Sequence, residues 1–180
     1  MTRRAVLALA TAAYLAVVAW ATLGTVSWHP IGWEAEYGVL TPSIWVDPDT
    51  WAIGSPREFV ANVAMFVPLA ALFALLLGPR RWLGALTAAI GVSVAIELVQ
   101  IPLDDRISDP RDLLANSIGA AIGVAAVGIG WIVLAIARTA SRLFRRSAGP
   151  ANDPGAGGGA VADAAPKTAP TRPELSRTGR

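Results

Sequence analysis

The sequence predicts an all-α membrane protein: a four transmembrane helix bundle with a long external loop and a disordered C-terminal tail. Apolar residues make up 54% of the 180 residues and charged residues only 16%, against roughly 25% charged residues in soluble domains. The apolar residues collect in runs of about 20, the length at which a helix crosses ~30 Å of hydrocarbon. Basic and acidic residues also alternate between the ends of successive runs, as they do in multi-pass proteins.

The apolar runs define the expected spans as residues 5–23, 59–77, 82–101 and 113–137. The first run follows Arg3 and Arg4, and a cleaved signal peptide is its alternative interpretation, because residues 19–21 resemble a cleavage site. The run is longer than the roughly 7–15 apolar residues of a signal peptide, which favours an uncleaved span. The third run contains a single charge, that of Glu97.

The charges that flank the spans predict their direction. One side has no acid up to residue 146 and has the arginines Arg3, Arg4, Arg80, Arg81, Arg138, Arg142, Arg145 and Arg146. The other side has Arg57, Arg106 and Arg111 together with Glu34, Glu36, Asp47, Asp49, Glu58, Asp104, Asp105, Asp109 and Asp112. Because positive charge stays in the cytoplasm, we expect a multi-pass protein of the cell membrane with both termini cytoplasmic. The arginines therefore indicate orientation, and we expect no nucleic-acid partner.

The regions outside the spans differ from each other. The external loop at residues 24–57 contains Trp28, Trp33, Tyr37, Trp45 and Trp51, which we interpret as interfacial anchors, with an aromatic ligand platform as the alternative. Residues 147–180 are rich in Pro, Gly and Ala and have no periodic apolar pattern, so we expect a disordered cytosolic tail. Residues 1–146 are the expected transmembrane domain.

Composition also limits the chemistry. The chain has no cysteine, and its single histidine is His29, so thiolate chemistry, His-rich metal sites and most histidine-dependent nucleophilic schemes are excluded. We predict no metal and no cofactor. No catalytic residue can be assigned from the sequence, and an enzyme is less expected than a binding protein.

Polar side chains gather at the external ends of three expected spans. A carboxylate within an apolar span costs at least ~2.5 kcal/mol, so Glu97 is a functional candidate by default. Asn62, Glu97 with Gln100, and Asp112 with Asn116 each follow a helical stripe. If these stripes face inward, they converge on one outward-facing pocket. The predicted functional cluster is Asn62, Glu97, Gln100, Arg106, Asp109, Asp112 and Asn116.

Several of these features have structural alternatives. Gly119 and Gly123 form a GxxxG pattern that permits close helix packing, and Pro68 removes one helical hydrogen bond and is expected to bend its span. Asn62 and Asn116 fit either interhelical hydrogen bonds or ligand contacts. The external arginines fit either pairing with neighbouring acids or binding of a phosphate or carboxylate.

At these residues the chain resembles the VanZ-like family of integral membrane proteins. The resemblance rests on Asn62 with Phe66-Val67-Pro68-Leu69, on Glu97-Leu98-Val99-Gln100, on Arg106, Asp109 and Asp112, and on Asn116, Gly119 and Gly123. Two positions depart from the family pattern: Ala70, where glycine is usual, and Glu58, where aspartate is commoner.

The resemblance implies a bacterial cell-envelope protein whose founding member gives low-level resistance to the glycopeptide teicoplanin. From the residue types, we expect binding of an anionic lipid-linked or cell-wall-related ligand at the outer face, with effects on glycopeptide susceptibility. The expected partners are membrane lipids and a lipid-linked cell-wall precursor or glycopeptide. The alternatives are a hydrolase acting on a polyprenyl phosphate, with Glu97 as general base, and a small transporter that needs an oligomer.

Overall fold

A computed structural model of the chain describes residues 1–24, 38–52, 54–103 and 108–147. The long helices are α1 (Arg3–Leu23), α3 (Pro56–Leu77), α4 (Trp82–Gln100) and α5 (Pro110–Ser147). Shorter elements are η1 (Gly38–Leu40), η2 (Pro42–Trp45), α2 (Pro48–Ala52) and η3 (Pro79–Arg81). Arg106, Trp28, Trp33, Tyr37 and the tail from residue 148 onward lie outside the described residues.

The prediction of four spans is confirmed within the described residues. The 4 helical segments long and apolar enough to cross a membrane are Arg3–Leu23, Pro56–Leu77, Pro79–Gln100 and Pro110–Arg145. The helices α1, α3 and α5 begin shortly before the predicted apolar runs, whereas α4 keeps within its run. The largest difference is at the other end of α5, which ends at Ser147, well beyond the predicted end at residue 137.

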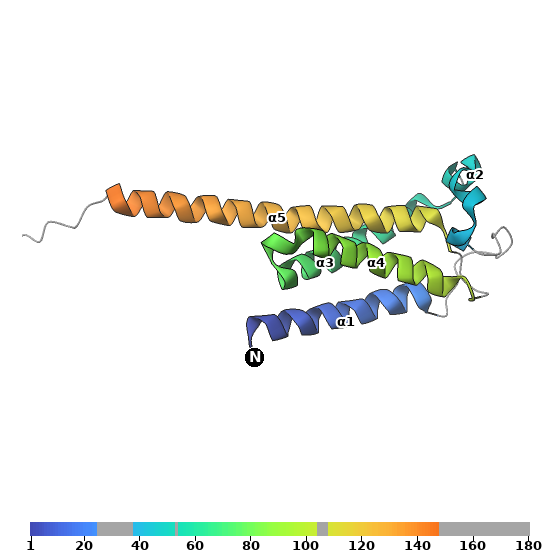
Figure 1. Cartoon of the computed structure of the whole chain (residues 1–180), viewed down its shortest axis with the longest axis horizontal. Coiled ribbons are helices and arrows are strands. Elements are labelled where there is room, and N and C mark those ends of the chain that lie inside the picture. Colours follow the sequence, from blue (N-terminus) through green and yellow to red (C-terminus); the bar gives the residue numbers. More distant parts are fainter. Residues whose placement is uncertain (25–37, 53, 104–107, 148–180) are drawn as a thin grey trace, which may run out of the picture. The chain divides into compact units, whose positions relative to one another are not determined.

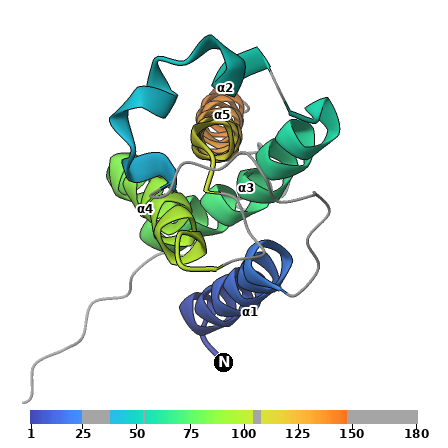
Figure 2. The ribbon, with the colours of Figure 1, turned by 90° about the vertical axis from the view of Figure 1, so that its right-hand side faces the viewer.

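The chain divides into two units, residues 1–141 and 142–180, and the packing described below belongs to the first. Within it, α3 packs against both α1 and α4, and α5 lies along α3 and α4 (Figures 1 and 2). Successive spans run in opposite directions. The ends of α1 and α4 and the starts of α3 and α5 therefore meet at one end, here named the acidic end. The opposite end, with the start of α1 and the turn η3, is named the basic end.

Apolar packing between the spans uses two different kinds of side chain. Large residues join α1, α3 and α4 in a cluster formed by Val18, Phe66, Leu69 and Ile96. Towards the basic end, α3, α4 and α5 meet through a cluster of Ala70, Ala74, Ala85, Ala89, Ala120 and Val124. Small side chains let helix backbones approach closely, and the resulting van der Waals contacts are one of the sources of helix association in lipid.

The closest approach is that of α5 to α3. A Cβ atom placed on Gly119 would meet the carbonyl oxygen of Val63, and one placed on Gly123 would meet that of Val67. Both glycines are therefore at positions where α5 lies directly on the backbone of α3, as the GxxxG pattern predicts.

The helix α3 continues from Pro56 to Leu77 through the internal Pro68. Near this proline, the Tyr14 hydroxyl on α1 donates a hydrogen bond of 3.0 Å to the carbonyl oxygen of Met65. The helix then ends at Gly78, whose φ of +85° is a conformation that L side chains rarely adopt. The chain can thus turn directly into η3 and α4.

Candidate functional site

The carboxylate of Glu97 lies inside the protein at the acidic end of α4. Its residue is only 1% exposed, so the side chain does not point towards lipid. Oε2 accepts a hydrogen bond of 2.9 Å from the backbone N–H of Asp109, and the carboxylate also forms a hydrogen bond with the Ser108 side chain. Glu97 therefore fastens the segment that precedes α5 to the end of α4.

Ser108 connects this segment to the external loop as well. Its residue is 8% exposed, and its Oγ accepts a hydrogen bond of 3.2 Å from the backbone N–H of Val39 in η1. Gly38 lies against the same serine, because a Cβ atom at this glycine would be 2.7 Å from Ser108 Oγ. In Figure 2 the segment that contains η1, η2 and α2 curves around the start of α5.

Asp109 starts α5. Its Oδ1 accepts a hydrogen bond of 2.8 Å from the backbone N–H of Arg111. Its backbone carbonyl oxygen accepts a hydrogen bond of 3.1 Å from the backbone N–H of Asp112. Pro110 follows as the first helical residue, where its missing N–H has no cost. Burial raises the pKa of Asp109, Glu58 adds to the rise through its negative charge, and the backbone N–H and guanidinium of Arg111 oppose it.

Both asparagines of the predicted cluster lie between helices. The Asn62 side chain on α3 lies beside the carboxylate of Asp112 on α5. Asn116 Nδ2 on α5 donates a hydrogen bond of 2.9 Å to Ser93 Oγ on α4. Asn116 is 2% exposed, and its Oδ1, like Oε1 of Gln100, has no hydrogen-bond partner among the described residues.

Gln100 joins α4 to α1. Its Nε2 donates a hydrogen bond of 3.1 Å to the carbonyl oxygen of Thr22. That carbonyl belongs to the last turn of α1, whose acceptors have no partner within the helix. Gln100 therefore caps α1 at the acidic end, and its place in the predicted cluster has this structural explanation.

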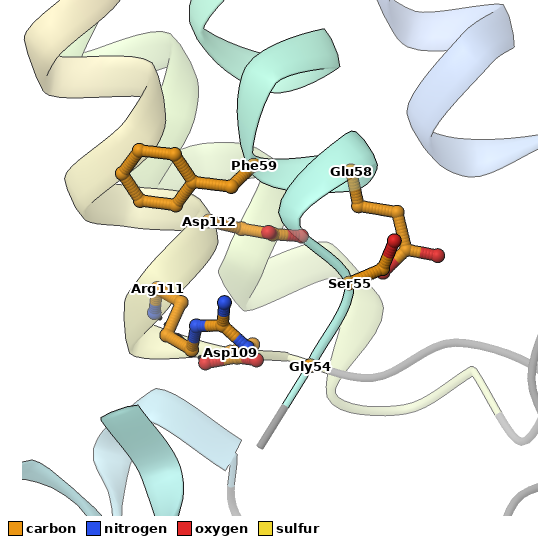
Figure 3. A pocket seen from close by; sticks show the side chains of 7 residues that line it. All are labelled: Gly54, Ser55, Glu58, Phe59, Asp109, Arg111 and Asp112. Carbon is orange, nitrogen blue, oxygen red and sulfur yellow. Dashed lines mark hydrogen bonds between the residues drawn. The ribbon is translucent and has the colours of Figure 1, made fainter. Parts of the chain in front are cut away.

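A small pocket opens between the starts of α3 and α5 (Figure 3). It has a volume of about 30 Å³ and is lined by Gly54, Ser55, Glu58, Phe59, Asp109, Arg111 and Asp112. The φ of Gly54 is +126°, and a Cβ atom at this position would collide with the guanidinium of Arg111. Glycine at residue 54 thus gives the Arg111 side chain its place at the pocket.

The structure distributes the predicted cluster over the acidic end and does not gather it around one cavity. Asp109 and Asp112 line the pocket. Glu97, Asn62 and Asn116 do not line it. Glu97 is connected to the pocket through Asp109, whose backbone N–H donates a hydrogen bond to its carboxylate. Arg106 lies outside the described residues.

Other residues at this end were not predicted as part of the site. Ser108 links Glu97 to η1, and Gly54, Ser55 and Phe59 line the pocket. Glu58 is the one lining residue with a sequence signal, because it precedes Asn62 by one helical turn on α3. Gly54, Ser55 and Ser108 lie in or beside irregular segments, where no periodicity indicates which side chains meet.

The pocket has a surplus of negative charge. Glu58, Asp109 and Asp112 contribute three carboxylates, and Arg111 contributes the one guanidinium among the lining residues. Carboxylates fit an ammonium group and a guanidinium fits a phosphate or carboxylate. Among the described residues, no group of three or more His, Cys, Asp or Glu side chains is arranged to hold a metal ion.

Comparison with known proteins gives one match. The family model described as VanZ/LLP1 matches residues 6–134, which include all four spans as far as the apolar part of α5. No curated protein and no solved structure matches the chain. The matched range also contains Asn62, Glu97, Asp109 and Asn116, on which the resemblance described above rests. The chain belongs to the VanZ/LLP1 family of membrane proteins.

Proposed function

We propose that this protein lies in the bacterial cell membrane with both termini in the cytoplasm, and that the pocket at its acidic end binds the headgroup of a lipid-linked cell-envelope ligand. The observation that carries the proposal is the pocket itself. It combines Arg111 with three carboxylates at the point where α3 and α5 begin their apolar runs, which is the level of lipid headgroups.

The distribution of charge supports the orientation. Arg3, Arg4, Arg80, Arg81 and Arg138 belong to the basic end, and no acid lies beside them in the sequence. Basic residues near short connections remain cytoplasmic. The pocket would then face the outer side of the membrane, where lipid-linked cell-wall precursors are used.

The charges of the pocket refine the expected ligand. A purely anionic headgroup would be attracted by Arg111 but repelled by Glu58, Asp109 and Asp112. A headgroup with an amino group beside its phosphate or carboxylate would satisfy both kinds of lining residue, with the amino group in the pocket of about 30 Å³ and the larger anionic group outside it. The peptide part of a lipid-linked precursor and an amino-phospholipid both have this chemistry. Binding of such a ligand would also connect the protein to glycopeptide susceptibility.

The alternative of a hydrolase receives no support from the site. It needs Glu97 as a general base in contact with substrate. Glu97 is 1% exposed, does not line the pocket, and is engaged by Asp109 and Ser108. We therefore do not propose an enzymatic activity. The transporter alternative likewise has no observation among the described residues that favours it.

Mass spectrometry of co-purified lipids tests the proposal. Wild type, Glu58→Gln and Asp112→Asn would be purified in a mild detergent and their retained lipids compared. We expect the wild type to retain lipids with a primary amine several-fold over other lipids, and both variants to lose this enrichment. Asp49→Asn is the matched control, because Asp49 is an exposed acid on α2 that does not line the pocket.

The same variants test the link to glycopeptides. In cells where the wild type changes teicoplanin susceptibility, Glu58→Gln should abolish the change, and Asp49→Asn should preserve it at equal expression. Identical lipid profiles in the wild type and both pocket variants would overturn the proposed ligand. A peptide-bearing precursor and an amino-phospholipid would be distinguished by their masses.

A further inference from the structure

Arginines from separate elements lie at the basic end of the first unit. Arg3 and Arg4 start α1, Arg80 and Arg81 form the turn η3, and Arg138 follows the apolar run of α5. All five are exposed. Each lies within a few residues of the boundary of an apolar run, so each is expected at the surface of the hydrocarbon layer.

None of these arginines has an acidic partner in the described part of the chain. No ion pair or side-chain hydrogen bond of theirs occurs there, and the sequence has no acid in residues 1–33, 59–96 or 113–146. This differs from the acidic end, where Arg111 is surrounded by carboxylates. Several like charges at one end repel one another, and no acid of the described residues lies beside them to offset this repulsion.

Aromatic and apolar side chains accompany the arginines of η3. Trp82 is 49% exposed and Leu83 is 56% exposed, directly after Arg81. Tryptophan is enriched where the acyl chains of a bilayer meet its headgroups. This neighbourhood of apolar rings and guanidinium groups fits a lipid surface, whereas a soluble anion would need no apolar contact.

We propose that the basic end is a docking surface for anionic phospholipid headgroups, with the Arg80-Arg81-Trp82 turn as its central part. The guanidinium groups would bind headgroup phosphates, and Trp82 would lie at the level of the glycerol and upper acyl chains. This inference concerns the end opposite the pocket and does not depend on the identity of the pocket's ligand.

Native mass spectrometry of the full chain with added lipid tests this surface. The protein in detergent would receive equal amounts of phosphatidylglycerol and phosphatidylcholine, and the retained lipids would be counted. We expect the wild type to prefer phosphatidylglycerol by roughly tenfold or more, since each basic residue near a membrane surface contributes about 1 kcal/mol, or roughly fivefold. The preference should decline when salt is added.

Two double variants and one control make the experiment decisive. R80Q/R81Q should lower the preference by at least about fivefold, and R80K/R81K should retain most of it, because the lysines keep the charge. R57Q is the control, because Arg57 is an exposed arginine at the acidic end of α3, and it should leave the preference unchanged.

Three results would overturn the proposal. The first is equal retention of both lipids by the wild type, and the second is an unchanged lipid preference in R80Q/R81Q. The third is competition for the site by soluble glycerol phosphate as strong as that by phosphatidylglycerol. The last result would indicate a site for a free anion in place of a bilayer surface. Unfolding temperatures of all variants in detergent alone would show whether each remains folded.

Discussion

The two halves of the bundle are held together by different interactions. At the acidic end, directional hydrogen bonds connect the spans and loops: Glu97 to Asp109, Asn116 to Ser93, and Gln100 to Thr22. Towards the basic end, α3, α4 and α5 meet through a cluster made almost entirely of alanines. Because lipid supplies no hydrophobic force between helices, the spans in this half are held together by close packing of small residues. The hydrogen bonds instead determine where helix ends and loops lie, and the pocket depends on that placement.

The largest loss of stability is expected from a change in the packing of α5 on α3. Gly119→Val would place side-chain atoms against the Val63 carbonyl and push α5 away from α3. We expect a loss of roughly 1–3 kcal/mol or more, measured as a lower unfolding temperature in detergent. Gly91→Val is the control, because a Cβ atom at Gly91 has nothing within 4 Å. Equal stability of the two variants would show that α5 does not rest on the α3 backbone.

Removing the acceptor at the acidic end should have the next largest effect. Glu97→Leu leaves the Asp109 N–H and the Ser108 hydroxyl without their acceptor, at a cost of roughly 1–3 kcal/mol for a buried group. Glu97→Gln retains a carbonyl oxygen and should lose much less. Hydrogen exchange at the start of α5 would report the change. If exchange there is equal in both variants, Glu97 does not fasten this segment.

The bond between Asn116 and Ser93 should contribute less. Hydrogen bonds between membrane helices average about 0.6 kcal/mol and reach about 1.7 kcal/mol. A double-mutant cycle with Asn116→Leu and Ser93→Ala should give a coupling energy in this range, measured by reversible unfolding in detergent. Zero coupling would mean that the two side chains contribute independently. The hydrogen bond would then not stabilise the acidic end, and packing alone would hold α4 and α5 together there, as in the alanine-packed half.

The smallest effect concerns pH. Because the folded-state pKa of Asp109 lies above its ordinary value of 3.8, the folded protein binds this proton more tightly than the unfolded chain does. The resulting stability is full below the ordinary value and is lost as the pH rises through the folded pKa. Between about pH 7 and about pH 4, the wild type should therefore gain stability relative to Asp109→Asn. A constant difference in unfolding temperature over this range would contradict the expectation.

The spans could be predicted from the sequence because an apolar run of membrane length is a property of the chain alone. Where the polar groups meet was predictable only in part. The spacing of Asn62, Glu97 and Asn116 indicates the acidic end correctly, since each lies near the same end of its helix. The partner of Glu97 could not be found this way, because it is the backbone N–H of a residue in an irregular segment, and any residue has such a group.

Tyr14 and the pocket illustrate the same limit of periodicity. Tyr14 counts as one more residue of an apolar run, and only the path of α1 past Met65 gives its hydroxyl a function. Gly54 and Ser55 belong to a connection whose course is decided by contacts with Arg111 and the start of α5. Such contacts depend on how helices are rotated about their axes, which a single sequence does not encode as a pattern.

The position of α3 has a consequence for biogenesis. Asn62 and the Val63 carbonyl on this helix meet Asp112 and Gly119, which are synthesised only after α4. In a nascent chain, α3 is therefore in the bilayer before α5 has been made. Until then, the Asn62 amide and the backbone surface against which Gly119 packs have no partner from α5. Release from the insertion machinery should follow the arrival of α5, and chains that stop short of residue 110 should be recognised and degraded by membrane proteases.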